Sequence, residues 1–392
     1  MTTTVLLVIL VVCIALVFDF TNGFHDTANA MATPIATGAM RPRVAVGVAA
    51  VLNLVGAFLS TSVAKTISGG LLHEGSTGVQ IGPALVFAGL IGAIVWNVST
   101  WYFGLPSSSS HALFGGLIGA ALVGAGFGSI DYGVLLGKVI IPAVLSPLTA
   151  GIVAFLATRI AYAITRRNDG RPDGRRVFRV GQVFSSSLVA LAHGTSDAQK
   201  TMGVITLALI AANMQQAGTG PQLWVILVCA LAIGIGTYSG GWRIIRTLGT
   251  GLTSVKPAQG FSSEVSTAST ILVSSSLGFA LSTTHVASGS VIGSGLGRRG
   301  STVRWVTAGR IVTGWVFTLP AAAVVGAVAA LLVRLGGVGI GIDAVLGLGF
   351  VILVFLRARP ERVDASSLER EVAGAGAAVH RPKNRDRRRA AA

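Results

Sequence analysis

The sequence predicts an all-α polytopic membrane protein made of two inverted-topology repeats, with broken helices and re-entrant hairpins. The first observation is composition: 52% of the 392 residues are hydrophobic and only 11% are charged, whereas soluble domains carry about 25% charged residues. The second is that long apolar runs fill most of the chain, and the third is that two short polar motifs each occur twice. This composition excludes a soluble globular protein, a disordered chain and a coiled coil.

The apolar runs are the expected membrane segments. A spanning helix needs about 20 apolar residues, so this length allows about ten to twelve spans. A polar break at 21–27 separates the runs 4–20 and 28–40, and a second break at 193–197 separates 178–192 from 198–213. The remaining runs are 44–64, 79–103, 111–128, 133–160, 222–240, 261–281, 285–297, 303–333 and 342–357. Because the start lacks the positive region of a signal peptide, we expect the first run to remain as a helix.

Basic residues gather in only some of the breaks between these runs. Of the 30 Lys and Arg, 25 lie near 41–43, 159–179, 243–256 and 298–304, or from residue 357 onwards. Loops rich in Lys and Arg stay in the cytoplasm, so residue 1 is predicted outside and the C-terminus cytoplasmic in a multi-pass chain of the cell inner (plasma) membrane. The net charge of +16 is therefore an orientation signal in a lipid bilayer, and no nucleic-acid partner is predicted.

These boundaries divide the chain into five expected parts. Residues 1–164 form the first transmembrane repeat and 181–335 the second. A basic cytoplasmic linker at 165–180 joins them. An extra transmembrane helix follows at 336–357, and 358–392 is expected to be a basic, disordered cytoplasmic tail. An odd number of crossings in each half, five by the run count, would place the two repeats in opposite orientations.

Two pairs of polar motifs indicate the duplication. Gly23-Phe-His-Asp-Thr-Ala-Asn-Ala30 is similar to His193-Gly-Thr-Ser-Asp-Ala-Gln-Lys200, and Asp26 and Asp197 are 171 residues apart. Pro106-Ser-Ser-Ser-Ser-His111 is similar to Leu281-Ser-Thr-Thr-His285, and the two histidines are 174 residues apart. Inverted repeats of broken helices that hold a substrate near the midplane are typical of secondary transporters.

The carboxylates of the first pair are candidates for the transport site. Asp26 and Asp197 lie within long apolar segments, where a carboxylate is costly and faces a partner or a water-filled path. The glycine and polar residues around them predict unwound backbone, which membranes tolerate only along a cavity. The alternative is a structural pair with a Lys or Arg.

The hydroxyl clusters of the second pair are candidates for anion binding. Ser107–Ser110 and Ser282–Thr284 each precede an apolar helix and should cap its first turn. Helix N-termini also attract anions, so two such ends could hold one tetrahedral oxyanion between them. The alternative is that these hydroxyls only join neighbouring helices. Glu264, in a serine-rich run before His285, is either a residue at the cytoplasmic boundary or a proton site.

At these residues the sequence resembles the inorganic phosphate transporters called PiT, over roughly residues 15 to 335. The family's signatures look like G-x-N-D-x-A-N-A and H-G-x-N-D-A-Q-K/N, with S-T-T-H at two hairpin tips. The matching residues are Gly23, Asp26, Ala28, Asn29 and Ala30, then His193, Gly194, Asp197, Ala198, Gln199 and Lys200, and at the hairpins Ser108, His111 and Ser282–His285. The resemblance implies transport of inorganic phosphate, which can travel as a neutral complex with a divalent cation.

Two departures from the family pattern concern the coupling ion. His25 and Ser196 replace the asparagines that precede the two aspartates, and in sodium-coupled members that Asn-Asp pair is implicated in sodium binding. The Gly-Phe-His-Asp form looks like the bacterial proton-coupled branch. An unperturbed histidine titrates near pH 6.5, which suits a proton carrier.

The sequence therefore predicts a low-affinity, proton-coupled phosphate symporter that works by alternating access. The predicted substrate-binding residues are Asp26, Asn29, Ser108, Ser109, Ser110, Asp197, Gln199, Ser282, Thr283 and Thr284. The predicted ion-coupling residues are His25, Asp26, Asp197 and Glu264. No catalytic residue, resident metal or cofactor is predicted, because no H-E-x-x-H or P-loop motif occurs.

Several alternatives stay open at this point. The same scaffold could carry sulfate or another oxyanion, or couple phosphate to sodium. A membrane-embedded enzyme would need a nucleophile–base set or metal ligands, and a channel fits two inverted broken-helix motifs less well than alternating access does. The sequence leaves the oligomeric state undefined, so a homodimer is also an open alternative.

Overall fold

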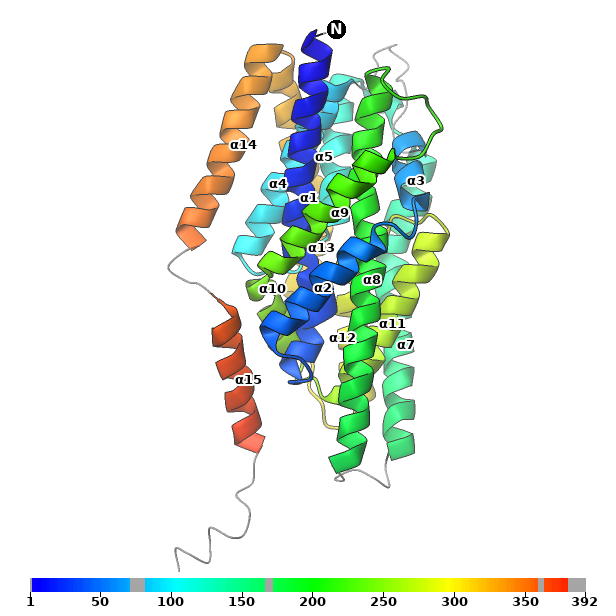
Figure 1. The fold of residues 1–392 in the computed structure, drawn as a ribbon, viewed down its shortest axis with the longest axis vertical. Coiled ribbons are helices and arrows are strands. Elements are labelled where there is room, and N and C mark those ends of the chain that lie inside the picture. The colour runs from blue at the N-terminus through cyan, green and yellow to red at the C-terminus, as the bar shows by residue number, and fades with distance from the viewer. Residues whose placement is uncertain (1, 71–81, 166–171, 359–362, 380–392) are drawn as a thin grey trace, which may run out of the picture.

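The computed structural model describes residues 2–70, 82–165, 172–358 and 363–379. Within these ranges the regular structure is helical apart from one isolated bridge between Thr253 and Val303. Most helices run along the long axis of the molecule (Figure 1). The all-α fold class is thereby confirmed for the described part of the chain.

The helices fall into two sets on either side of the central break at 166–171. The first set is α1 (Thr2–Ala36), α2 (Pro42–Gly56), α3 (Ser62–Gly70), α4 (Pro83–Tyr102), α5 (Ser109–Gly124), α6 (Tyr132–Val134) and α7 (Ile141–Thr165). The second set is α8 (Pro172–Ala211), α9 (Leu223–Ser239), α10 (Trp242–Arg246), α11 (Pro257–Ser276), α12 (Thr283–Gly297) and α13 (Trp305–Val333). Short turns of other helix types are η1 (Phe127–Ser129), η2 (Leu135–Ile140) and η3 (Thr247–Gly251), and α14 (Gly337–Ala358) and α15 (Ala365–Val379) follow.

Five of the described helices are long and apolar enough to cross a membrane, and the bent pair of α9 with α10 and η3 would be a sixth. This is fewer than the ten to twelve spans expected from chain length. The physical reason lies in the other helices: α2 and α5 are short, and α8 and α11 carry many buried polar side chains. Apolar length alone does not identify a helix that hides polar groups inside the molecule.

The helix breaks lie elsewhere than expected. We predicted unwound backbone at 21–27 and 193–197, but α1 and α8 continue through both motifs. The polar side chains are satisfied without unwinding, as when the Thr27 hydroxyl donates to the carbonyl of Gly23, 2.7 Å away, one turn earlier. The bend of 60° is instead between α9 and α10, where Gly240 has a φ of 71° that favours glycine.

The two hairpin tips are built as predicted. Helix α5 follows a loop after α4, and α12 follows a loop after α11. The Ser108 hydroxyl accepts the backbone N–H of His111 at 3.1 Å, and the Ser282 hydroxyl accepts that of His285 at 3.2 Å. Both hydroxyl clusters therefore cap helix starts, and the two tips meet through their histidine rings, whose centroids are 4.8 Å apart.

The helices that carry the first motif pair run in opposite directions, α1 downward and α8 upward in Figure 1. Each packs closely on a helix from the other half. A Cβ added at Gly23 of α1 would meet the carbonyl oxygen of Ile233 on α9, and one added at Gly194 of α8 would meet that of Asn53 on α2. The two glycines are separated by the same offset as the two aspartates, so the motif glycines serve close packing.

The hairpin helices show the same exchange. A Cβ at Gly115 of α5 would meet the carbonyl oxygen of Leu319 on α13, and one at Gly289 of α12 would meet that of Pro147 on α7. Gly115 and Gly289 are again 174 residues apart. Contacts that recur at one offset are what two repeats produce when they exchange helices.

The ends of the predicted parts differ from the structure in two places. Helix α14 matches the extra helix expected at 336–357. The linker expected at 165–180 lies partly in α8, which begins at Pro172, and residues 166–171 are outside the described part. In the tail expected to be disordered, residues 365–379 form α15, because Leu368 is buried and Glu371 pairs with Arg246 at 3.0 Å.

Candidate functional site

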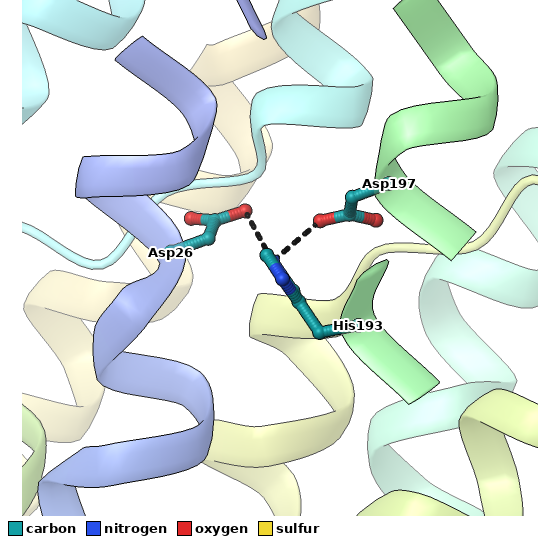
Figure 2. Close-up of side chains that lie close together, drawn as sticks. All are labelled: Asp26, His193 and Asp197. Carbon is teal, nitrogen blue, oxygen red and sulfur yellow. Dashed lines mark ion pairs between the residues drawn. The ribbon is translucent and has the colours of Figure 1, made fainter. Parts of the chain in front are cut away.

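The two motif aspartates face each other at the centre of the molecule, with a histidine between them. His193 Nε2 lies 2.8 Å from Asp197 Oδ2 and 3.9 Å from Asp26 Oδ2, as Figure 2 shows. All three side chains are at most 1% exposed. Asp26 comes from α1 and the other two residues from α8, so the crossing of these two helices forms the site.

The spacing of polar residues on α8 explains why they converge. His193 and Asp197 are four residues apart and Lys200 is three residues further. Residues three and four apart lie on one face of a helix. A single face of α8 therefore presents an imidazole, a carboxylate and an ammonium to α1 and the hairpin tips.

Hydroxyls of the hairpin tips donate to both carboxylates. Ser109 Oγ donates to Asp26 Oδ2 at 2.8 Å, and Thr283 Oγ1 donates to Asp197 Oδ2 at 3.0 Å. Ser109 and Thr283 occupy equivalent places in the duplicated motif, so each aspartate is contacted by the tip of its own half. Thr284 Oγ1 also reaches Asp26 Oδ1 at 3.3 Å.

A second pair of equivalent contacts crosses between the halves. Lys200 Nζ donates to Ser110 Oγ at 2.5 Å, and Asn29 Nδ2 donates to Thr284 Oγ1 at 3.0 Å. Lys200 also forms an ion pair with Asp197 Oδ1. Asn29 and Lys200 each lie three residues after the motif aspartate, so one half supplies a neutral amide where the other supplies an ammonium.

His25 extends the network on the side of Asp26. Its Nδ1 lies 2.6 Å from Asp26 Oδ1. Its Nε2 faces the hydroxyls of Thr100 and Ser107, at 3.3 and 3.4 Å, and Ser107 donates to Thr100. His25 is 0% exposed. The imidazole thus joins the carboxylate to the loop between α4 and α5.

Some predicted residues serve the backbone instead of this cluster. Gln199 Oε1 accepts the N–H groups of Val63 and Ala64 at the start of α3, and its amide donates to the carbonyl of Thr195. The expectation of a substrate role for Gln199 is therefore not matched by where its side chain points. Ser108 and Ser282 are committed to the helix caps described above.

Glu264 lies in a separate buried cluster. Thr33 and Ser185 donate to its carboxylate at 2.5 and 2.6 Å, and Gln182 donates at 3.1 Å. Thr33 is seven residues beyond Asp26 on α1, which is about 10 Å along a helix. Glu264 is 2% exposed, so it is not the boundary residue of the first alternative, and it does not touch the two aspartates.

Sequence reasoning missed several members of the central network. His193 and Lys200 were noted only as motif matches, and Thr100, Ser107 and Asn53 were not singled out. Asn53 Oδ1 lies 3.3 Å from His193 Nδ1. A buried lysine within an apolar run is a signal that could have found Lys200, because intramembrane ionisable groups are costly and face a partner.

The arrangement suits an oxyanion that carries a proton. The tip hydroxyls and Lys200 are donors for anion oxygens, while two ionised carboxylates accept hydrogen bonds and repel groups without a proton. The carboxylate and imidazole atoms of Asp26, His193 and Asp197 also lie within 4.8 Å of one another, close enough to hold a metal ion. No metal site was predicted from the motifs, so this grouping is a difference from the sequence prediction.

Comparisons with known proteins agree with the sequence resemblance. The family model described as "Phosphate transporter family" matches residues 22–326, which is more than half of the chain. Two similar relatives carry the name "Probable low-affinity inorganic phosphate transporter". The relative from Mycobacterium leprae is 50% identical and the alignment covers 96% of this chain and 92% of the relative. The relative from Bacillus subtilis is 42% identical, with 83% and 96% covered.

One solved structure is similar in fold. It is titled "The sodium-dependent phosphate transporter", with a TM-score of 0.74 and 23% sequence identity, covering 84% of this chain and 99% of that chain. At this identity the likeness concerns the fold alone.

Proposed function

This chain belongs to the phosphate transporter family, and from that premise we propose that it carries inorganic phosphate across the plasma membrane as a low-affinity, proton-coupled symporter. The observation that carries the proposal is the pair of buried carboxylates, Asp26 and Asp197, each contacted by hydroxyls from a hairpin tip. Phosphate enters between the tips, takes over donors from Ser109, Ser110, Thr283 and Thr284, and donates its own P–OH to a carboxylate. Family and relatives are transporters, which supports transport over catalysis.

Sulfate is the alternative oxyanion, and the carboxylates argue against it. Sulfate at neutral pH has no proton to donate, so a buried carboxylate facing it adds repulsion without a hydrogen bond. Hydrogen phosphate and dihydrogen phosphate both offer a proton. The geometry thus supports phosphate selectivity through acceptors as well as donors.

Uptake of labelled phosphate into proteoliposomes tests this proposal. We expect saturable uptake that excess unlabelled phosphate abolishes and that a tenfold excess of sulfate leaves within about a factor of two. The reason is the loss of a charge-assisted hydrogen bond, worth about 1.5–3 kcal/mol or about ten- to a hundredfold in affinity. Equal competition by sulfate would contradict the selectivity.

A divalent metal–phosphate complex is a second candidate for the carried species. It is favoured by the three ligand-type side chains that lie within 4.8 Å of one another. Uptake measured with magnesium and with a chelator separates the two forms, because only the complex needs the metal.

The coupling proton is assigned to the side of the site that holds His25. This imidazole lies against Asp26 and faces two hydroxyls, whereas an imidazole is a poor ligand for sodium. Glu264, surrounded by three donors, offers a second proton position further along α1. Together they give a route for one proton from the central network towards Glu264.

The coupling ion is tested by replacing ions and by changing His25. Uptake is expected to persist when choline replaces sodium and to collapse with a protonophore. His25→Gln keeps a polar side chain of similar reach but cannot titrate, so it should flatten the dependence of uptake on external pH more than it weakens phosphate binding. Transport that requires sodium at fixed pH, and survives the protonophore, would rule out this assignment.

The orientation follows from where basic loops meet. Arg246 pairs with Glu371 of α15, and Arg304 donates to the carbonyl of Thr250, so several basic loops share one end of the molecule with α15. Positive loops face the cytoplasm, which places α15 inside the cell and the loop between α8 and α9 outside.

Labelling of introduced cysteines tests the orientation. In a chain whose Cys13 and Cys229 are replaced, Ala217→Cys should react with an impermeant maleimide on intact cells, because Ala217 is exposed at the end of the molecule opposite to α15. Ser366→Cys, which is also exposed, should react only after the cells are permeabilised. The reverse pattern would invert the proposed topology.

A further inference from the structure

We propose that Lys200 is a built-in cation of the substrate site: its ammonium neutralises Asp197 and binds a phosphate oxygen, so that this half of the site needs no cation from solution. This inference rests on the proposed phosphate transport. It adds a residue that determines which ion the transporter requires. The geometry around Lys200 and the comparison of the two halves carry the argument.

Lys200 is held at the centre of the network. Its side chain is 0% exposed and is among the largest fully buried side chains of the described residues. The ammonium pairs with Asp197 Oδ1 and donates to Ser110 Oγ at 2.5 Å. A lysine ammonium has three N–H donors, and these two partners leave a third for an oxygen of the anion. The lysine therefore joins the carboxylate to the hairpin tip where phosphate is proposed to enter.

The equivalent place in the other half holds no charge. Asn29 lies three residues after Asp26, as Lys200 lies three after Asp197, and it donates to the Thr283 and Thr284 hydroxyls. Both side chains thus bind the opposite hairpin tip. The two halves have similar geometry but differ by one positive charge.

That difference decides where a coupling cation is needed. Two buried carboxylates disfavour an incoming anion unless positive charge is brought in with it. Lys200 supplies one positive charge to Asp197 permanently. The remaining negative charge is on Asp26, whose neighbours His25 and His193 lie at 2.6 and 3.9 Å and can each take a proton. The cation requirement is then confined to the Asp26 side and met by protons.

The variant Lys200→Asn tests the inference, because it gives both halves the same residue. Without the ammonium, Asp197 is left as an uncompensated buried charge, which is strongly unfavourable. Uptake by Lys200→Asn in sodium-free choline buffer should fall at least about tenfold. Sodium or lithium, which can take the vacated place beside Asp197, should restore uptake at least threefold. Wild-type uptake should be equal in choline and sodium.

Two further variants serve as controls. Lys200→Arg retains the positive charge and should keep uptake insensitive to sodium even if the rate falls. Lys65→Asn changes an exposed lysine on α3 and should behave as the wild type does. A Lys200→Asn protein that elutes as a folded species, yet shows no stimulation by sodium or lithium, overturns the inference.

Phosphate binding to the wild-type protein decides the question if the variant does not fold. Calorimetry in a buffer free of sodium and containing EDTA should show phosphate binding, because Lys200 supplies the cation. Binding that appears only with sodium or a divalent metal overturns the inference while leaving phosphate transport intact. Wild-type protein that neither binds nor takes up phosphate with any cation would instead contradict the proposed function itself.

Discussion

Phosphate uptake is expected to fall at least about 100-fold in Asp197→Asn and Asp26→Asn, the largest effect on transport that the structure implies. In Asp197→Asn the Lys200 ammonium loses its counter-charge, and breaking a buried pair costs about 3–5 kcal/mol, where each 1.4 kcal/mol is about tenfold. In Asp26→Asn the new amide presents donors where Ser109 and Thr284 already donate.

Uptake into proteoliposomes at equal protein content measures this effect, with size-exclusion chromatography to verify that the variants fold. Asp364→Asn is the matched control, because Asp364 is exposed at the start of α15 and an asparagine can also cap a helix. Its uptake should equal that of the wild type. Normal uptake by both site variants would remove the two aspartates from the proposed substrate site.

The largest effect on stability is expected from single methyl groups at the helix crossings. Gly23→Ala and Gly194→Ala each place a Cβ against backbone atoms of α9 or α2, so two helices must separate. Overpacking of this kind costs about 1–3 kcal/mol and occasionally more. The thermal unfolding midpoint of the detergent-purified protein should fall in both variants, and the yield of monodisperse protein should fall with it.

The same substitution at open positions provides the control. Gly47 on α2 and Gly314 on α13 have no atom within 4 Å of an added Cβ. Alanine in a helix interior is more favourable than glycine by about 0.5–1 kcal/mol, so Gly47→Ala and Gly314→Ala should raise the midpoint slightly. If the two crossing variants behaved like these controls, the close helix contacts would be wrong.

The sequence was most informative where charge and hydrogen bonding leave no choice. Asp26 and Asp197 could be singled out because a carboxylate in an apolar run needs partners, and Ser108 and Ser282 because a helix start needs a cap. Both expectations agree with the structure. The equal offsets of the motifs also anticipated which residues occupy equivalent places.

Other features depend on partners that are distant in the chain. Gln199 has the composition of a ligand, but its amide is used by the start of α3, a contact that no local pattern signals. The unbroken course of α1 and α8 depends on glycines fitting α9 and α2 rather than on local propensity. For the same reason Leu368 and Glu371 hold α15 as a helix in a tail whose composition predicts disorder.

The exchange of helices between the halves has a consequence for biosynthesis. A polytopic chain is made from its N-terminus, so α1, α2, α5 and α7 enter the bilayer before α8, α9, α12 and α13 exist. Gly23, Gly56 and Gly115 then have only lipid against the surfaces that will later receive α9, α8 and α13. The first half cannot reach its final packing alone, and the site at Asp26 and Asp197 comes into being only when synthesis of the second half is complete. Chain termination anywhere before α13 therefore yields an unassembled intermediate for quality control to remove, rather than a smaller working transporter.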